Sequence, residues 1–563
     1  MRPIRFAFAI TAALALACNT LLPRAAPTPT VAPTEAVAPT PAVPPTAAAT
    51  PTLARPSDLY IGPGDVAVHP DTGIYSGDRV SFEVFPRDGA NIGLENFPVA
   101  MYWGETQLAF GPAERYGLGG RLQATFAWVW DTAGLAGPQT ITVVLDPQGE
   151  IRSGDEIKDN NTLTFTVNVL PRNELPVAQR EAEWITAESD CCAFNYITGS
   201  AAERDIETIR STAESAIAFV EEKLGREQAG KMAFNFIDRL LGHGGFASDS
   251  VTITYIDRDY AGGGLETVFR HEAAHILNRQ GGGQRPSLIE EGMATYIAGG
   301  HFKEEPFEPR MVGVLALDRY IPLAQLADNF YASQHEIGYL EGAALIEYLV
   351  AEYGWDQFTV LLGAFQRAGS ESAMLDGGLR VAYNKSLSTI ESEWLDHLRA
   401  QPLDERWKND AAFTIAYYDT VRRYQQAFDS SAHFLTAWVP DIARAVREDI
   451  TADYDRHPSA PQNVALETML IEVDRAIEAA DFATAARYLA SVNAVIASGG
   501  SFDSDALAAD YLQLTLAALD AGYEPQRIHL ESDSATVAAS PPEQAAALVE
   551  ITLTRVDGVW RVN

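Results

Sequence analysis

Hydrophobic and polar residues alternate along the chain from about residue 57 to residue 171. Turn sequences such as DTG, PRDG and DPQGE separate the alternating runs. A period of two is typical of strands that bury one face, and short strands between such turns predict an all-β sandwich over residues 57–171. The clearest alternating positions are Val80, Phe82, Val84, Phe126, Trp128, Trp130, Ile141, Val143, Leu145, Leu163, Phe165, Val167 and Val169.

The hydrophobic period becomes helical in the next part of the chain, which we place at residues 180–403. Ser200 and Glu203 have the spacing of a capping box before a helix that carries apolar residues on one face. Two strand-like runs follow, MAFNFID and VTITYID, and then two helical segments, VFRHEAAHIL and LIEEGMATYIA, separated by GGGQRP. Strands followed by helices predict an α+β domain. The face of the first helix comprises Ile206, Ile209, Ala213, Ile217, Val220 and Leu224.

Residues 404–563 are predicted to be mainly helical, with an antiparallel helical pair in the segment ALETMLIEVDRAIEAADFATAARYLASVNAVI. The last seventeen residues alternate again around Asp557 and Gly558, which indicates a terminal β-hairpin. The expected fold is therefore multidomain, with an all-β sandwich, an α+β domain and a mainly α region that ends in a hairpin.

The first 56 residues have no globular pattern. Arg2 and Arg5 precede an apolar run that ends in Ala-Leu-Ala before Cys18, so residues 1–18 have the form of a secretory signal. Residues 19–56 are rich in Pro, Thr and Ala and predict an extended linker. Cys18 directly after small residues resembles a bacterial lipoprotein signal, which implies lipidation of Cys18; plain secretion is the alternative.

Composition narrows the possible partners. The 563-residue chain has a formal net charge of -35, so it lacks the basic surface that nucleic acid binding requires. No other stretch is apolar for long enough to cross a membrane. We expect a protein that is exported across the cytoplasmic membrane and held on its outer side by a lipid anchor.

Four residues in the two central helices have the types and spacing of a metal-dependent hydrolase. His271 and His275 are four positions apart, so they lie on one face of a helix and can hold one zinc ion. Glu272 lies between them, where it can reach a zinc-bound water, and Glu291 follows in the second helix. An ordinary helix with two unrelated histidines is the simpler alternative, and the acidic second helix argues against it.

These motifs resemble the gluzincins, the zinc metallopeptidase group that includes thermolysin and the aminopeptidase N family. The segment PSLIEEGMA is similar to the family pattern P-x-W-L-x-E-G-x-A, and the glutamate before glycine is the family ligand, here Glu291. The resemblance implies that Thr295 buttresses a ligand histidine. It also implies that Tyr339, or else His335, stabilises the oxyanion.

The function that we expect is hydrolysis of peptide bonds in a peptide or protein substrate, with Glu272 as the general base and Zn²⁺ as the cofactor. No amine-anchoring Gly-x-Met-x-Asn motif precedes the zinc helix, which favours an endopeptidase. Two alternatives remain: a catalytically silent surface binding or adhesion lipoprotein, and a zinc hydrolase that acts on peptidoglycan stems.

The sequence does not fix the roles of the remaining polar residues and of two adjacent cysteines. The segment GDEIKDNNTLTFTVNV resembles the end of bacterial cell-adhesion-related immunoglobulin-like domains, so the sandwich is a candidate site for a cell-surface partner. Its acidic residues are candidate calcium ligands, although a polar hairpin is the preferred interpretation; they are Asp155, Glu156, Asp159 and Asn160. Cys191 and Cys192 are expected to form a vicinal disulfide or to stay as thiols.

Overall fold

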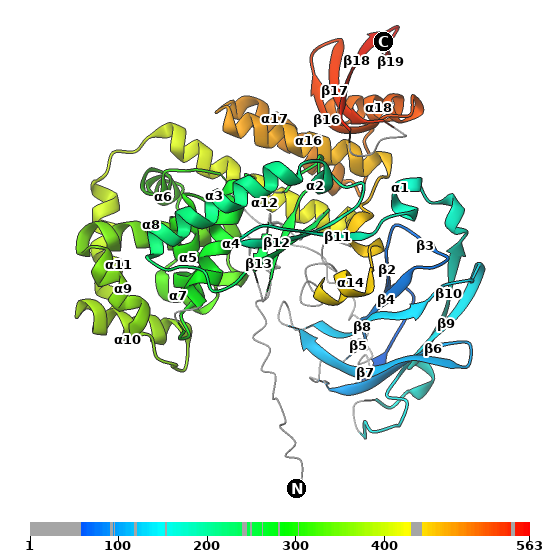
Figure 1. The fold of residues 1–563 in the computed structure, drawn as a ribbon, viewed down its shortest axis with the longest axis horizontal. Helices are drawn as coiled ribbons and strands as arrows, with labels where there is room; N and C mark the ends of the chain where they lie inside the picture. The colour runs from blue at the N-terminus through cyan, green and yellow to red at the C-terminus, as the bar shows by residue number, and fades with distance from the viewer. Residues whose placement is uncertain are drawn as a thin grey trace, which may run out of the picture.

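A computed structural model describes residues 58–563 except for 90–93, 95, 117–120, 153–154, 239–244, 248–249, 262, 280–281, 302, 430–441 and 542–546. The expected signal peptide with Cys18, the whole of the expected linker and residue 57, the first residue of the expected sandwich, lie outside the described residues. Figure 1 shows a β-rich N-terminal part, a central part with the α3, α4, α5 and α8 helices, and a C-terminal part that ends in a small sheet.

The N-terminal part is all-β, as its alternating pattern predicts. Eight strands pair in the order β2-β4-β8-β7-β6-β9-β10-β3, and their inward side chains form one apolar core. A two-stranded sheet of β1 and β5 lies beside them. The strands are β1 (Leu59–Tyr60), β2 (Val66–His69), β3 (Ile74–Tyr75), β4 (Arg79–Val84), β5 (Arg87–Asp88), β6 (Phe97–Trp103), β7 (Thr106–Tyr116), β8 (Arg121–Asp131), β9 (Gly137–Leu145) and β10 (Thr162–Leu170), and η1 (Lys158–Asn160) is a 3-10 turn.

Trp128 departs from the alternation that predicted it to share a face with Phe126 and Trp130. Its φ is +51°, and the pairing of β8 with β4 shifts there, so Phe126 and Trp130 enter the core of the N-terminal β-rich part while Trp128 does not. The Trp128 ring packs instead with Tyr454 and Ile442 from the C-terminal part. A bulge that redirects one side chain is a backbone feature that a period of two does not reveal.

The acidic turn before the last strand is held by hydrogen bonds within the protein. Asp155 accepts hydrogen bonds from Lys158 Nζ at 2.6 Å and from Asn161 Nδ2 at 2.8 Å. Over the described residues, Asp155, Glu156 and Asp159 belong to no group of three His, Cys, Asp or Glu side chains that could hold a metal ion. These contacts agree with the polar hairpin.

The central part is built on a five-stranded sheet in the order β11-β12-β13-β15-β14. Strands β12, β13 and β15 run parallel, and α3 connects β12 to β13 with its predicted face buried at Ile209, Ala213, Ile217 and Val220. Cys191 and Cys192 form a disulfide with each other. The elements are η2 (Arg172–Glu174), α1 (Val177–Arg180), β11 (Trp184–Glu188), β12 (Cys192–Ile197), α2 (Ala201–Arg204), α3 (Ile206–Leu224), β13 (Met232–Ile237), β14 (Gly245–Ala247) and β15 (Val251–Thr254).

Helices complete the central part and cover the sheet, and they share its apolar core. They are α4 (Leu265–Arg279), α5 (Ser287–Ala298), α6 (Phe307–Ala316), α7 (Leu323–Asp328), η3 (Phe330–Ala332), α8 (His335–Tyr353), α9 (Trp355–Ala364), α10 (Glu371–Tyr383) and α11 (Leu387–Ala400). None of the helices in the described part of the chain is both long and apolar enough to span a membrane.

The C-terminal part is helical and ends in a four-stranded antiparallel sheet rather than in a single hairpin. The predicted hairpin is β18–β19, and the strands β16 and β17 extend it, so the mainly helical prediction for this part of the chain fails at β16 and β17. The elements are α12 (Glu405–Phe428), α14 (Ile442–Glu448), α15 (Ala452–Asp455), α16 (Pro461–Glu478), α17 (Phe482–Ala497), α18 (Ala506–Asp520), β16 (Glu524–Leu530), β17 (Ser534–Ser540), β18 (Val549–Val556) and β19 (Val559–Val562).

Buried polar contacts join the C-terminal part to the other two. Arg456 binds both carboxylate oxygens of Asp78 in the sandwich, each at 2.8 Å, and Trp128 Nε1 donates to Asp453 at 2.8 Å. On the other side, Arg258 of the central part binds Glu467 and Glu524. The C-terminal part therefore contacts both the N-terminal part and the central part through buried polar groups.

Candidate metal centre

Helix α4 places two histidines and a glutamate in a buried position beside the sheet. The segment Leu265–Arg279 has no proline or glycine inside it, and its first turn is secured by the Gly264 carbonyl, which accepts from Val268 N. Phe269, Ala273, Ala274 and Leu277 are fully buried. Their burial fixes the rotation of the helix, so that His271, Glu272 and His275, at 6%, 5% and 5% exposure, project from a defined face.

Helix α5 positions Glu291 through an unusually close helix contact. A Cβ on Gly292 would lie 2.6 Å from the carbonyl carbon of Gly342 in α8, so only glycine fits at this crossing. Gly299, with φ of +83°, ends the helix in the left-handed conformation that glycine favours. The glycine in the EEG motif thus lets the two helices approach at the residue directly after Glu291.

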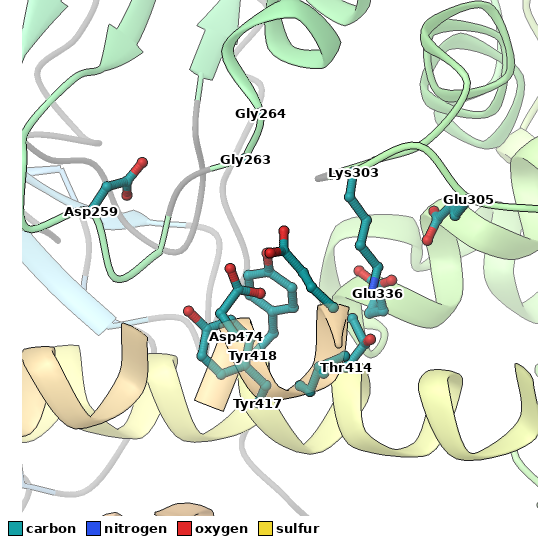
Figure 2. Close-up of a pocket in the computed structure, with 12 residues that line it drawn as sticks. Asp259, Gly263, Gly264, Lys303, Glu305, Glu336, Thr414, Tyr417, Tyr418 and Asp474 are labelled. Atoms are coloured by element: carbon teal, nitrogen blue, oxygen red, sulfur yellow. The ribbon is translucent and has the colours of Figure 1, made fainter. Parts of the chain in front are cut away.

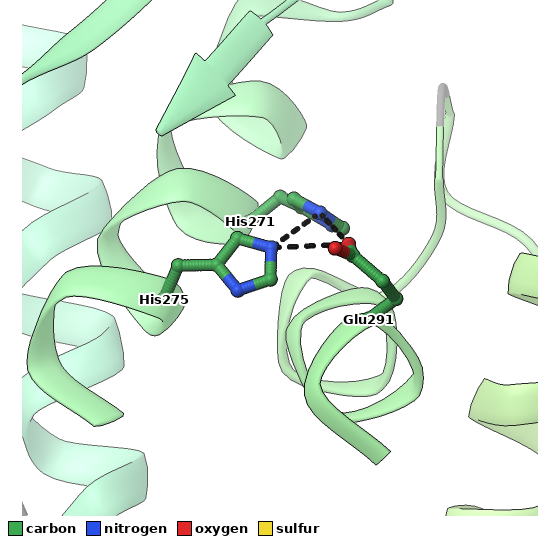
Figure 3. Close-up of side chains that lie close together, drawn as sticks. All are labelled: His271, His275 and Glu291. Carbon is green, nitrogen blue, oxygen red and sulfur yellow. Dashed lines mark hydrogen bonds and ion pairs between the residues drawn. The ribbon is translucent and has the colours of Figure 1, made fainter. Parts of the chain in front are cut away.

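The structure brings His271, His275 and Glu291 together (Figure 3). The Nε2 atoms of the two histidines are 3.1 Å apart. Oε2 of Glu291 lies 3.1 Å from Nε2 of His275 and 3.4 Å from Nε2 of His271. Three donor atoms from two helices therefore converge on one point.

This donor set fits a zinc ion. A tetrahedral ion with bonds of about 2.0–2.1 Å holds its donor atoms roughly 3.4 Å apart, close to the separations seen here. Two imidazole nitrogens and one carboxylate oxygen are ligands that zinc accepts, and three protein ligands leave a fourth position open. Among the described residues, no other cluster of three potential ligands occurs.

The charges in the site depend strongly on burial. Burial raises the pKa of Glu291, but the adjacent His275 and His271 outweigh this effect and hold the pKa well below its usual value. Burial raises the pKa of Glu272 to about 7, with a further rise caused by Glu291 and an opposing effect of His271. A cation among the three ligands would oppose that rise and favour the ionised Glu272.

The other predicted site residues lie close to this centre. Thr295 is fully buried, and its hydroxyl donates to the carbonyl oxygen of Glu291 at 2.8 Å, one turn back in the same helix. The Tyr339 ring is 5% exposed and lies 6.0 Å from the His271 ring, centroid to centroid. His335 begins α8, and its side chain lies outside the described residues.

Comparisons with known proteins give distant structural likenesses. No family model matches the chain, and no curated protein matches it. An M1 zinc metallopeptidase from Deinococcus radiodurans matches over 62% of this chain and 96% of its own length, at 15% identity and a TM-score of 0.28.

Two smaller structures match about a fifth of the chain. A CARDB domain from Pyrococcus furiosus, in complex with di-metal ions, matches 21% of this chain and 90% of its own length, at 18% identity and a TM-score of 0.16. A domain of a putative cell surface protein from Methanosarcina acetivorans matches 20% of this chain and 92% of its own length, at 20% identity and a TM-score of 0.15. Because all three TM-scores lie below 0.5, we interpret the site from this chain's own residues.

Two residues near the metal centre were not found from the sequence. The Tyr331 hydroxyl donates to Oε1 of Glu291 at 2.6 Å, which leaves Oε2 facing the histidines. His301 is buried, and its ring stacks on Tyr339 with centroids 3.8 Å apart. Burial lowers the pKa of His301 to about 4, although the facing Glu336 partly opposes this. Neither residue belongs to a short motif, so sequence spacing carried no signal for them.

Proposed function

We propose that this protein is an extracytoplasmic zinc metallopeptidase of the gluzincin type, which hydrolyses peptide bonds in peptide or protein substrates. The convergence of the donor atoms of His271, His275 and Glu291 at zinc spacing, with Glu272 buried next to them, carries the proposal. A silent scaffold has no physical need for a complete ligand set together with a buried carboxylate beside it.

Each residue has a separate role in this proposal. The three ligands would hold a zinc ion, which when bound would supply the Lewis acid needed to polarise the scissile carbonyl. Glu272 accepts a proton from the attacking water and passes it to the leaving amine. Tyr331 orients the Glu291 carboxylate through its hydrogen bond, as outer partners of metal ligands commonly do.

Tyr339 is the proposed group that stabilises the developing negative charge on the carbonyl oxygen. Its ring is held between His301, at 3.8 Å, and Phe330, at 5.2 Å, so its orientation is restricted before substrate binds. A fixed hydroxyl costs little reorganisation when charge develops on a substrate oxygen.

The proposal also covers how the protein is attached to a membrane and how it contacts a partner. We infer that Cys18 carries a lipid that attaches the protein to a membrane, and that the N-terminal β-rich part, as an immunoglobulin-like sandwich, contacts a cell-surface partner. Metabolic labelling with a fatty acid tests the first role, because a Cys18→Ser chain will remain unlabelled.

The decisive experiment measures bound zinc and peptide cleavage on the same samples. We expect the wild-type chain to bind one zinc ion and to cut members of an unbiased peptide library. Glu272→Gln should keep the zinc and lose about 10²–10⁴-fold in cleavage rate, the usual contribution of a general base. His271→Ala should lose the zinc as well, because two ligands remain.

Glu266→Gln is the matched control, since Glu266 lies on the same helix with a half-exposed side chain that pairs with Arg270. Full cleavage by Glu272→Gln would refute the assigned mechanism. Zinc binding without cleavage in the wild type would favour the silent binding protein. Cuts near peptide ends or inside peptides would distinguish exopeptidase from endopeptidase action.

A further inference from the structure

A cavity of about 220 Å³ lies next to the metal centre, between the Gly263–Gly264 loop, α8 and the C-terminal helices α12 and α16. Glu336 lines this cavity, and its Oε2 lies 3.6 Å from Nδ1 of His301. The His301 ring is in turn 5.9 Å from the ring of His271. The His301 side chain therefore lies between the cavity and His271, one of the three candidate metal ligands.

The cavity has more carboxylates than its own cations can neutralise. Arg310 binds Glu305, Glu336 and Asp410, and Lys303 binds Asp410 at 3.1 Å, so two cations already face three carboxylates. Two more carboxylates line the same space without adding a cation to it, and they belong to Asp474 and Glu478. Figure 2 shows Lys303, Glu336, Thr414 and Asp474 around the space between the glycine loop and α12.

These two carboxylates lie on α16, where Asp474 is partly buried and Glu478 is exposed. Asp474 and Glu478 are four residues apart on α16, so their like charges lie on one face of the helix. Burial, reinforced by repulsion from Glu478, raises the pKa of Asp474 to about 7. A cation beside Asp474 would favour the ionised form of that carboxyl group.

A second observation at the cavity also points to a ligand. Thr414 lines the cavity and is 5% exposed, yet its Oγ1 has no hydrogen-bond partner among the described residues. A buried hydroxyl without a partner is costly, and threonine in a helix normally bonds to the carbonyl four residues back. A donor group in the cavity would satisfy this oxygen, and an ammonium or guanidinium group is such a donor.

The spacing of the carboxylates argues for an organic cation. Within the described residues, no three potential ligand atoms of this cavity lie within 4.8 Å of one another, in contrast to the metal centre. A group with several N–H donors on a flexible stem can contact acceptors that are spread over a wider space.

We propose that this cavity binds a positively charged group of the peptide substrate, an ammonium or guanidinium, and so selects substrates with a cation close to the cleaved bond. The inference rests on the proposed peptidase function and specifies its substrate class.

The first test compares N-acetylated peptides of one sequence in which a single residue is lysine or the uncharged, isosteric norleucine. The substitution is moved one position at a time along the peptide. At one position, lysine should raise kcat/KM about tenfold over norleucine, which is the factor that one charge-assisted hydrogen bond supplies. The same peptides with free amino termini reveal whether the terminal ammonium is the cation instead.

The second test removes the charges. Asp474→Asn with Glu478→Gln should reduce the preference for the cationic peptide several-fold. Asp503→Asn with Asp520→Asn removes charges from two exposed aspartates of the same C-terminal part and should keep the preference. The ratio of two substrates on one protein sample is independent of how much of a variant folds.

Equal cleavage of charged and uncharged peptides in both the blocked and the free series would overturn the proposal. A preference that persists in the cavity variant would do the same. If no peptide is cut at all, the proposed peptidase function fails. The cavity can then still be tested by comparing the affinities of fluorescent lysine and norleucine peptides for the zinc-loaded Glu272→Gln chain. Equal affinity in that measurement would refute the inference.

Discussion

At the scale of single residues, a hydrogen bond fixes the orientation of Glu291 in the candidate metal centre. Glu291 has two carboxylate oxygens with different partners, since Tyr331 donates to Oε1 while Oε2 faces the histidines. Because Tyr331 donates to Oε1, only Oε2 is oriented toward the position where a metal ion would bind. His271 differs, because its buried Nδ1 has no partner in the described part of the chain.

Tyr331→Phe removes one hydrogen bond to a ligand and little volume. We expect zinc affinity to fall about 10–100-fold, the usual effect of losing an outer partner of a metal ligand. Competition with a zinc chelator measures this. Tyr320→Phe is the matched control, because the Tyr320 hydroxyl donates to Glu391, away from the metal ligands. Equal affinity of the Tyr331→Phe and wild-type chains would contradict the positioning role.

At the scale of elements, the crossing of α5 and α8 sets the distance between Glu291 and the histidine helix. Gly292 and Gly342 face each other, and a Cβ on either would come within 3 Å of the other's backbone. Backbone atoms of two packed helices cannot move aside as a flexible side chain does. The two glycines therefore act as a pair.

Gly292→Ala is expected to destabilise the protein by about 1–3 kcal/mol, because the added methyl group overpacks the crossing. It should also weaken zinc binding, since Glu291 moves with its helix. Gly363→Ala in α9 adds the same methyl group where nothing lies within 4 Å, so it should be neutral or stabilising by up to about 1 kcal/mol. Chemical denaturation of both variants checks the difference, and equal stability would refute the packing explanation.

At the scale of the whole molecule, ionic contacts connect the C-terminal part to the central part. His457 lies between Asp238 at the end of β13 and Glu524 at the start of β16, at 2.7 Å and 3.4 Å. Burial lowers the pKa of His457, but the hydrogen bonds to Asp238 and Glu524 outweigh burial and raise it to about 9. Arg258 opposes the rise.

This contact predicts a pH-dependent stability. The pKa of about 9 in the folded protein exceeds the usual 6.5, so protonated His457 stabilises the folded state fully below pH 6.5. The contribution, at most about 3 kcal/mol, is lost as the pH rises through 9. The gap in unfolding midpoint between wild type and His457→Gln should therefore shrink from pH 6 to pH 10. A constant gap would contradict the assigned charge.

The sequence by itself determined the local features of this protein. The period of two predicted the β-rich part, and the spacing of His271, Glu272 and His275 placed them on one helix face, because both patterns follow from backbone geometry. Glu291 was identified as a candidate ligand only through its motif, and in the structure it lies beside the two histidines.

Tertiary structure decided which distant segments meet. Tyr331 contacts Glu291 from 40 residues away, Trp128 leaves the sandwich to contact Asp453, and Thr414 and Asp474 line a cavity with Glu336. These contacts depend on how helices and domains pack, and packing is decided by many weak interactions that no short stretch of sequence encodes. The three candidate metal ligands thus lie on two helices, whereas the acidic cavity forms only when the distant segments of the molecule pack together.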